Sequence, residues 1–165
     1  MEARLWDEMM QSKHGHFYSL CILQNKKDII KWFNIVTLSI SGAGGILGWK
    51  VWTNFPVIVC IIIAVMQLIK LLQPQIIPSD KELDKLNKVI NFYVDYYNKL
   101  ESLWYDHYNN RINDEEAQRR FYELKESEKS INDLVNEVIK KGVNKKAYKS
   151  AEVDTNSYVQ RTFNR

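Results

Sequence analysis

Residues 32–69 read WFNIVTLSISGAGGILGWKVWTNFPVIVCIIIAVMQLI, and this stretch decides the fold of the chain. Residues 32–49 are 18 uncharged residues and residues 51–69 are 19 more, with Lys50 as the single charge between them. A helix of about 20 apolar residues matches the hydrocarbon thickness of a bilayer. We therefore predict two membrane-spanning helices, at about 32–50 and 54–73, and a short turn makes them an antiparallel hairpin.

Lysines flank this hairpin on one side only. The loop between the spans has Lys50 alone, whereas several lysines precede the first span or follow the second: Lys26, Lys27, Lys31, Lys70, Lys81, Lys85 and Lys88. By the positive-inside rule, both termini of this multi-pass membrane protein are predicted to be cytoplasmic. The alternative, a helical hairpin in a globular core, would need far more apolar surface elsewhere in the chain.

Small and polar residues form one face of the first span. GAGGILG at 42–48 is not a phosphate-binding loop, because its glycines are spaced G-x-G-x-x-x-G and no P-loop lysine follows. In a membrane helix, small residues four apart let two backbones approach closely. Three interpretations remain open: a seam between subunits, the wall of a narrow aqueous path, or packing against the second span. The candidate face, with one polar residue from the second span, comprises Thr37, Ser41, Gly44, Gly45, Gly48 and Gln67.

The rest of the chain is predicted to be helical and to lie outside the membrane. Residues 1–31 read as an N-terminal cytoplasmic amphipathic helix, and 79–141 read as a cytoplasmic helical hairpin that turns near Asn109 and is capped at Asn113. Its first helix carries apolar residues at alternating steps of three and four, as in heptads. These helix- or oligomer-packing candidates are Leu83, Leu86, Ile90, Tyr93, Tyr97, Leu100 and Trp104. The fold class is thus an all-α membrane protein.

The last 24 residues, 142–165, form a basic polar tail that is either a short helix or disordered. Residues 140–165 carry seven bases against two acids. The tail is either a solvated segment or a surface for anionic lipid headgroups or a phosphate-bearing ligand. The candidate signal-binding residues are Lys140, Lys141, Lys145, Lys146, Lys149, Arg161 and Arg165.

Enzymatic chemistry is not expected. The net charge of +3 argues against a dedicated nucleic-acid-binding domain. Cys21 and Cys60 do not form a disulfide framework or a metal knuckle, and His14 and His16 point apart on a helix. No nucleophile–base or paired-carboxylate arrangement stands out, so we expect no catalytic residues, no metal and no cofactor.

The order of these segments resembles the SLATT family of prokaryotic two-transmembrane effectors. The residues that carry the resemblance are the hairpin from Trp32 to Leu72 and the amphipathic run after PSDKELDKL. The resemblance implies a pore-forming effector of bacterial antiviral defence, paired with a companion nucleotidyltransferase or nucleotide sensor. A nucleotide or oligonucleotide product would control the pore, and depolarisation of the membrane would cause growth arrest or cell death.

Two spans cannot enclose a pore alone, so this function requires a homo-oligomer, a tetramer or a larger ring in the lipid bilayer. Two other classes remain open. In the first, the hairpin is a non-conducting anchor for a coiled-coil adaptor that recruits a partner. In the second, the chain is a holin-like lysis protein that needs no ligand.

Overall fold

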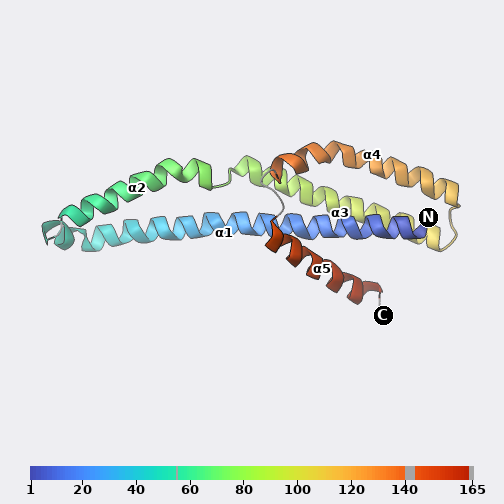
Figure 1. The fold of residues 1–165 in the computed structure, drawn as a ribbon, viewed down its shortest axis with the longest axis horizontal. Coiled ribbons are helices and arrows are strands. Elements are labelled where there is room, and N and C mark those ends of the chain that lie inside the picture. Colours follow the sequence, from blue (N-terminus) through green and yellow to red (C-terminus); the bar gives the residue numbers. More distant parts are fainter. Residues whose placement is uncertain (55, 140–143, 164–165) are drawn as a thin grey trace. The chain divides into compact units, whose positions relative to one another are not determined.

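The computed structural model describes residues 1–54, 56–139 and 144–163, and within them the side chains other than those of 40–54, 56, 59 and 76. These residues form five helices (Figure 1): α1 (Glu2–Asn54), α2 (Pro56–Ile76), α3 (Asp80–Tyr108), α4 (Asp114–Val138) and α5 (Lys145–Phe163). No strand occurs among the described residues, and the predicted all-α class is confirmed.

The chain divides into two compact units. The first, here the bundle unit, combines Met1–Leu23 with Lys81–Arg165. The second, here the apolar unit, is Gln24–Asp80. Helix α1 is unbroken over 53 residues and contributes to both units, so the N-terminal segment expected at 1–31 and the first expected span belong to one helix.

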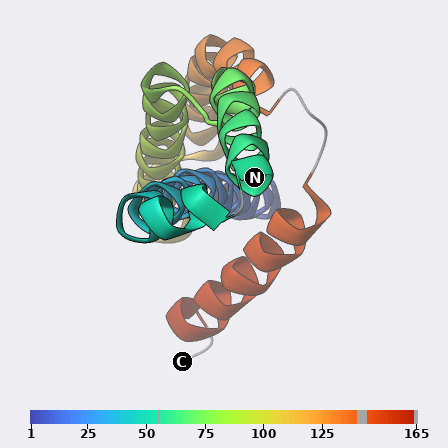
Figure 2. The ribbon, with the colours of Figure 1, turned by 90° about the vertical axis from the view of Figure 1, so that its left-hand side faces the viewer.

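The main core of the bundle unit lies between α1, α3 and α4, which run side by side (Figures 1 and 2). Full burial of one large apolar side chain stabilises a fold by about 1.5–3 kcal/mol. The seven buried side chains of this cluster come from all three helices: Leu5, Met9, Tyr96, Tyr97, Leu100, Leu103 and Phe121. The N-terminal part of α1 is therefore an integral part of the bundle unit.

Two smaller clusters complete the bundle unit. One joins Leu23 of α1 to Leu86 and Ile90 of α3 and to Val138 of α4. The other holds α5 against α1 and consists of Tyr18, Ala147 and Ala151. The segment 142–165, for which a helix and disorder were both open, thus contains helix α5, because its alanines provide a face that packs on α1.

Polar residues set the turn between α3 and α4. Asn110 has φ 54°, a left-handed conformation that asparagine tolerates better than most residues. Asn113 is the N-cap of α4, and its Oδ1 accepts a hydrogen bond of 2.8 Å from the backbone N–H of Glu116. The predicted turn and cap are confirmed at these residues.

Helices α1 and α3 approach closely at Gly15. A Cβ at this position would lie 2.9 Å from the ring of Tyr93, closer than real Cβ contacts. One turn earlier, the Ser12 hydroxyl donates to the backbone carbonyl of Tyr93 at 3.2 Å. Any side chain at position 15 would thus require the Tyr93 ring to shift, which the sequence alone did not single out.

Candidate functional site

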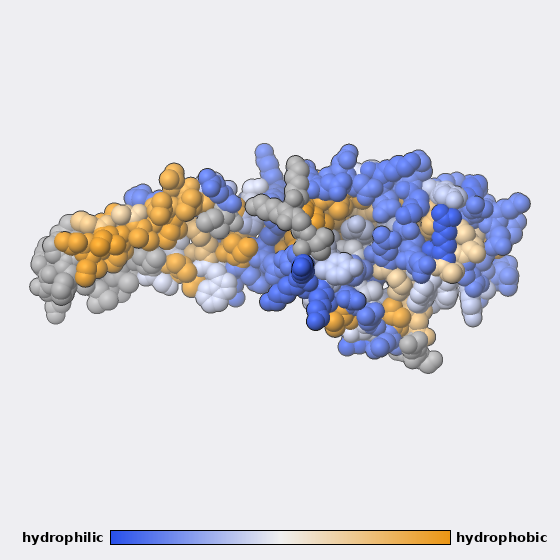
Figure 3. All heavy atoms as spheres, in the orientation of Figure 1, coloured by the Kyte–Doolittle hydropathy of each residue, from blue (hydrophilic) through white to orange (hydrophobic). Residues whose placement is uncertain are grey.

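The described side chains of α2 form an exposed apolar surface (Figure 3). Val57 and Leu71 are 70% and 72% exposed. Other isoleucines and leucines of this helix are exposed as well: Ile58, Ile61, Ile62, Ile63, Leu68 and Leu72. An exposed apolar surface of this kind marks contact with a membrane or with another protein.

One helical stretch of the described residues is long and apolar enough to cross a membrane. It lies within Cys60–Tyr108, and its most apolar window of 18 residues has a mean hydropathy of 1.8 and is not buried at all. The sequence of α2, Pro56–Ile76, has the length that a hydrocarbon core requires. The side chains of residues 40–54, which include much of the first expected span, lie outside the described residues.

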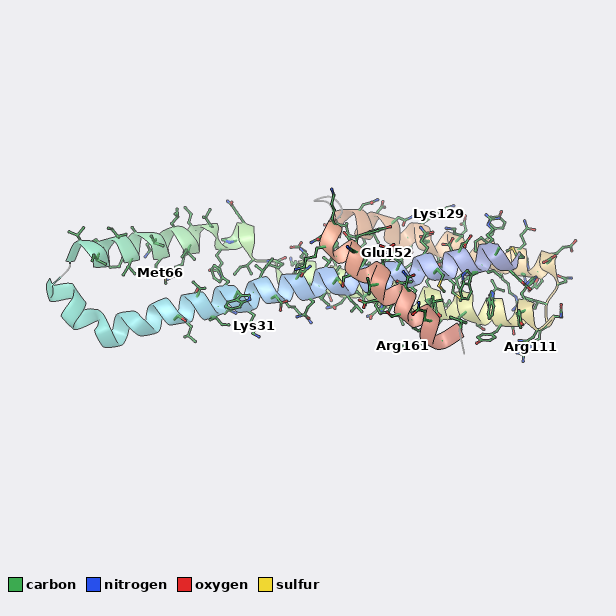
Figure 4. All side chains as sticks on the ribbon, turned by 60° about the horizontal axis from the view of Figure 1, so that its bottom comes forward. Lys31, Met66, Arg111, Lys129, Glu152 and Arg161 are labelled. Atoms are coloured by element: carbon green, nitrogen blue, oxygen red, sulfur yellow. The ribbon has the colours of Figure 1, made fainter. Side chains whose placement is uncertain are left out.

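The candidate small-residue face lies on α1, but only part of it can be described. Thr37 is half-buried, and Gln67 is exposed on α2 near Met66, which is labelled in Figure 4. Ser41, Gly44, Gly45 and Gly48 belong to α1, and their surroundings lie outside the described residues. Large apolar residues of α1 just before this face are exposed: Ile29, Trp32, Ile35, Val36 and Leu38.

The packing candidates on α3 lie in or beside the cores of the bundle unit. Leu86, Ile90, Tyr97 and Leu100 are buried, and Leu83, Tyr93 and Trp104 are half-buried. Sequence reasoning missed Val89, Tyr96 and Leu103, which are also buried. The missed residues stand directly before Ile90, Tyr97 and Trp104, so adjacent apolar pairs signal a stripe wide enough to contact two helices.

A buried polar cluster joins α1, α3 and α4. Glu8 is 8% exposed, and its Oε1 accepts hydrogen bonds from the Tyr96 hydroxyl at 3.1 Å and from Lys125 Nζ at 2.9 Å. Lys125 Nζ also donates to Glu128 Oε2 at 3.2 Å. Burial lowers the pKa of Lys125, but the hydrogen bonds to Glu8 and Glu128 outweigh it and raise the pKa, so the ammonium form is retained.

A cavity of about 180 Å³ lies beside this cluster. It is lined by Glu8, Gln11, Ser12, His14, Gly15, Tyr93, Tyr96 and Glu128. The His14 Nε2 atom is buried and has no hydrogen-bond partner among the residues that the structure describes. Among the described residues, no three His, Cys, Asp or Glu side chains are grouped so that they could hold a metal ion.

A half-buried charge lies where α1, α3 and α5 meet. Lys13 Nζ is 4.2 Å from the ring centroid of Tyr97 and 3.9 Å from that of Tyr158. The two tyrosine hydroxyls are 2.9 Å apart, and the Tyr97 hydroxyl donates to Glu101 Oε1 at 3.0 Å. Burial lowers the pKa of Lys13, and the charge of Glu101 partly offsets this effect. We call Lys13, Tyr97, Glu101 and Tyr158 the lysine clamp.

The structure separates the basic tail candidates into groups. Lys145, Lys146 and Lys149 are exposed within the first two turns of α5. Arg161 is also exposed, but it lies 16 residues after Lys145, about 24 Å along a helix. Lys140, Lys141 and Arg165 lie outside the described residues. Three of the seven candidates thus share one end of α5.

An open cavity of about 430 Å³ lies between α3 and α4. Charges of both signs line it, including Lys99, Asp106, Arg120 and Glu123. Nearby, Arg120 pairs with Glu116 of its own helix at 2.6 Å. These charges are mutually compensated and exposed, so they do not form a site with a net preference for an anion or a cation.

Comparison with protein-family models, with curated protein sequences and with solved structures finds no match to this chain.

Proposed function

We propose that the protein is an oligomeric, pore-forming membrane effector. The observation that carries the proposal is the exposed apolar surface of α2, which has the length of a membrane span and exposes aliphatic side chains from Val57 to Leu72. A second span on the C-terminal part of α1 would pair with α2 as a hairpin, with both termini on the cytoplasmic side. Because two spans cannot surround a pore, the conducting form is a ring of four or more copies.

The small-residue face of α1 is the part of this proposal that concerns the pore. Glycines and serines allow helices to pack closely, and hydroxyl groups can line a narrow aqueous path. Thr37, Ser41, Gly44, Gly45 and Gly48 would lie between subunits or beside the path of the ions. The spans have no acidic residue between 32 and 69, which argues against a proton-relay transporter.

A nucleotide-type signal is proposed to control the pore, in a bacterial antiviral defence system whose companion protein is a nucleotidyltransferase or a nucleotide sensor. This part rests on the resemblance to SLATT effectors. Lys145, Lys146 and Lys149 support it, because three exposed ammonium groups at the start of α5 can attract a phosphate-bearing ligand. Opening of the pore would collapse the membrane potential and stop growth.

The direct test is to reconstitute the purified chain in a planar bilayer and to record current, first alone and then with a panel of nucleotides. Discrete unitary steps are expected, and their dependence on a nucleotide gives the sign of control. A silent bilayer with inserted, oligomeric protein would overturn the pore and favour the anchor. Large, unselective and ligand-independent conductance would instead favour the holin-like class.

A further inference from the structure

Helix α5 contacts the rest of the bundle unit mainly through small side chains along its first half. Ala147 and Ala151 are 3% and 0% exposed, and Thr155 is 7% exposed. The Thr155 hydroxyl bonds to the Ala151 carbonyl of its own helix at 2.7 Å, so it adds no bond to α1 or α3. Alanine methyl groups bury little area, so this part of α5 is held more weakly than the leucine-rich face of α3.

The second half of α5 ends on aromatic residues of α1 and α3. Phe163 packs on Trp6 with ring centroids 4.9 Å apart and on Trp104 at 6.1 Å. At the other end, just before the first residue of α5, the backbone N–H of Asn144 donates to the Tyr18 hydroxyl at 3.1 Å. Both ends of α5 are thus held by contacts at a surface, as for a helix bound in a groove.

The lysine clamp lies in the middle of this interface. One of its effects favours docking of α5, and another opposes it. The rings of Tyr97 and Tyr158 attract the Lys13 ammonium, and a cation over two aromatic faces favours the docked helix. Docking also removes Lys13 from water, which disfavours its charged form. When α5 leaves, Lys13 regains hydration, and this gain offsets part of the lost contact.

We propose that α5 is a releasable helix, which undocks from α1 and α3 as one unit while α1, α3 and α4 remain packed. The seven buried side chains of the core all come from α1, α3 and α4, and α5 adds only Tyr158 and Phe163, which pack against it partly buried. We therefore expect this core to persist without α5. Release uncovers Lys13, Tyr97, Trp6 and Trp104, an aromatic surface with a central cation. Low-stability elements that open locally are commonly the ones that move in regulation.

The test compares thiol labelling at two fully buried alanines in the full chain. Ala151 of α5 and Ala117 of α4 are both 0% exposed, so Ala151→Cys and Ala117→Cys are matched variants. Both are made after replacing Cys21 and Cys60 by serine. We expect the thiol at 151 to react with a maleimide at least about tenfold faster than the thiol at 117, with unchanged helical content. Equal rates would show that α5 opens only when the whole unit unfolds, and the proposal would be wrong.

A second variant tests the role of the clamp. Tyr158→Leu keeps an apolar side chain on α5 but removes one ring over Lys13 and the hydroxyl that meets Tyr97. We expect it to accelerate labelling at 151 by about threefold or more and to leave labelling at 117 unchanged. An unchanged rate at 151 would remove the clamp from the mechanism of release, and an equal acceleration at both thiols would indicate general destabilisation and contradict the proposal.

A control function for α5 rests on the proposed pore. A bulky maleimide on the thiol at 151 holds α5 undocked, so it should change the bilayer current at least twofold, whereas modification at 117 during the same exposure should not. A current unaffected by labelling at 151 would overturn the control function. If the unmodified chain never conducts, the pore proposal fails, and the labelling rates still decide whether α5 is releasable.

Discussion

Ile61 and Val153 are both 57% exposed, but they stand on helices of different character. Ile61 is surrounded on α2 by other exposed aliphatic side chains, whereas Val153 lies between Glu152 and Asp154 on α5. A single exposed apolar residue needs no explanation, but an apolar helix does. The neighbours of an exposed apolar residue therefore indicate whether its surroundings are water or an apolar medium.

Ile61→Arg should reduce membrane insertion, because an arginine at the centre of a span costs about 2.5–3.5 kcal/mol on insertion scales. Val153→Arg is the matched control and should leave the protein in the membrane fraction. The measurement is the distribution between membrane and soluble fractions after carbonate extraction. Equal distributions of the two variants between the fractions would contradict the proposal that α2 spans the membrane.

Glu8 shows how much a buried carboxylate depends on its partner. Its side chain is 10% exposed, and Lys125, which is 36% exposed, is its cationic partner. Lys125→Met should lower the free energy of unfolding by about 1–2 kcal/mol, less than for a fully buried pair because water reaches the lysine. Urea unfolding followed by circular dichroism measures the change.

Lys129→Met is the control for this prediction. Lys129 pairs with Glu126 at 2.6 Å on the same helix, and both side chains are more than 70% exposed. Such surface pairs contribute little, so we expect no measurable change in unfolding. If both variants destabilise equally, the buried position of Glu8 has no special effect.

The phenols of Tyr96 and Tyr97 predict a loss of stability at alkaline pH. Burial and the charge of Glu8 raise the pKa of Tyr96, and burial with the hydrogen bonds to Tyr158 and Glu101 raises the pKa of Tyr97. In the unfolded chain both phenols ionise near pH 10. The unfolded state then binds fewer protons than the folded state, so the free energy of unfolding falls as pH rises above about 10.

The measurement is the free energy of unfolding from pH 8 to about pH 11 for the wild type and for Tyr97→Phe. Lys13 contributes with the opposite sign, since burial lowers its pKa, and the comparison with Tyr97→Phe separates the tyrosine from it. The wild type should lose more stability than the variant above about pH 10. Parallel curves would contradict the burial of this phenol.

At the scale of one element, the side chain of Asn113 caps the N-terminus of α4. Asn113→Ala should lower the free energy of unfolding by about 1 kcal/mol, because the N–H of Glu116 loses its acceptor. Asn113→Asp keeps a side-chain oxygen at the same place and should stay close to the wild type. Urea unfolding of the two variants provides the comparison. A loss of equal size in both would show that the cap oxygen is not the cause.

The helices themselves could be predicted better than their limits. The N-terminal segment and the first apolar segment read as separate elements because their side chains suit different solvents. The backbone hydrogen bonds of a helix do not depend on that difference, and no proline interrupts residues 2–54. The change from a polar to an apolar composition therefore occurs within α1 and does not end the helix.

Helix α3 shows the same limit at the level of packing. Its alternating steps of three and four predicted a stripe through Leu86, Ile90, Tyr97 and Leu100, and these residues are buried. The stripe is wider than a heptad seam because α1 and α4 both contact it, which also buries Tyr96 and Leu103. One sequence gives the direction of a face but not the number of its neighbours.

The lysine clamp and the Glu8 cluster could not be predicted, because their members come from distant parts of the chain. Glu8 and Lys125 are 117 residues apart, and Tyr97 and Tyr158 are 61 residues apart. Each residue alone reads as an ordinary charged or aromatic position on a helix. Their function depends on tertiary contacts that no local spacing encodes.

For the whole molecule, the assembly prediction concerns the glycine face of α1. Gly45→Leu adds bulk on the face that also carries Ser41 and Gly48, whereas Ala43→Leu adds similar bulk about half a turn away. In lipid nanodiscs, the wild type and Ala43→Leu should show four or more copies and unitary current, and Gly45→Leu should lose the current. Normal conductance of Gly45→Leu would refute the role of this face.

The bundle unit is built from the two ends of the chain, and this has a consequence for biosynthesis. Leu5 and Met9 are translated early, but their core partners Leu100 and Phe121 leave the ribosome later, after the whole apolar unit. At about 5–20 residues per second, the N-terminal segment waits several seconds with its apolar stripe uncovered. Residues 24–80 are therefore synthesised before the bundle unit can close, and a chain stalled before residue 121 is an exposed target for chaperones and proteases.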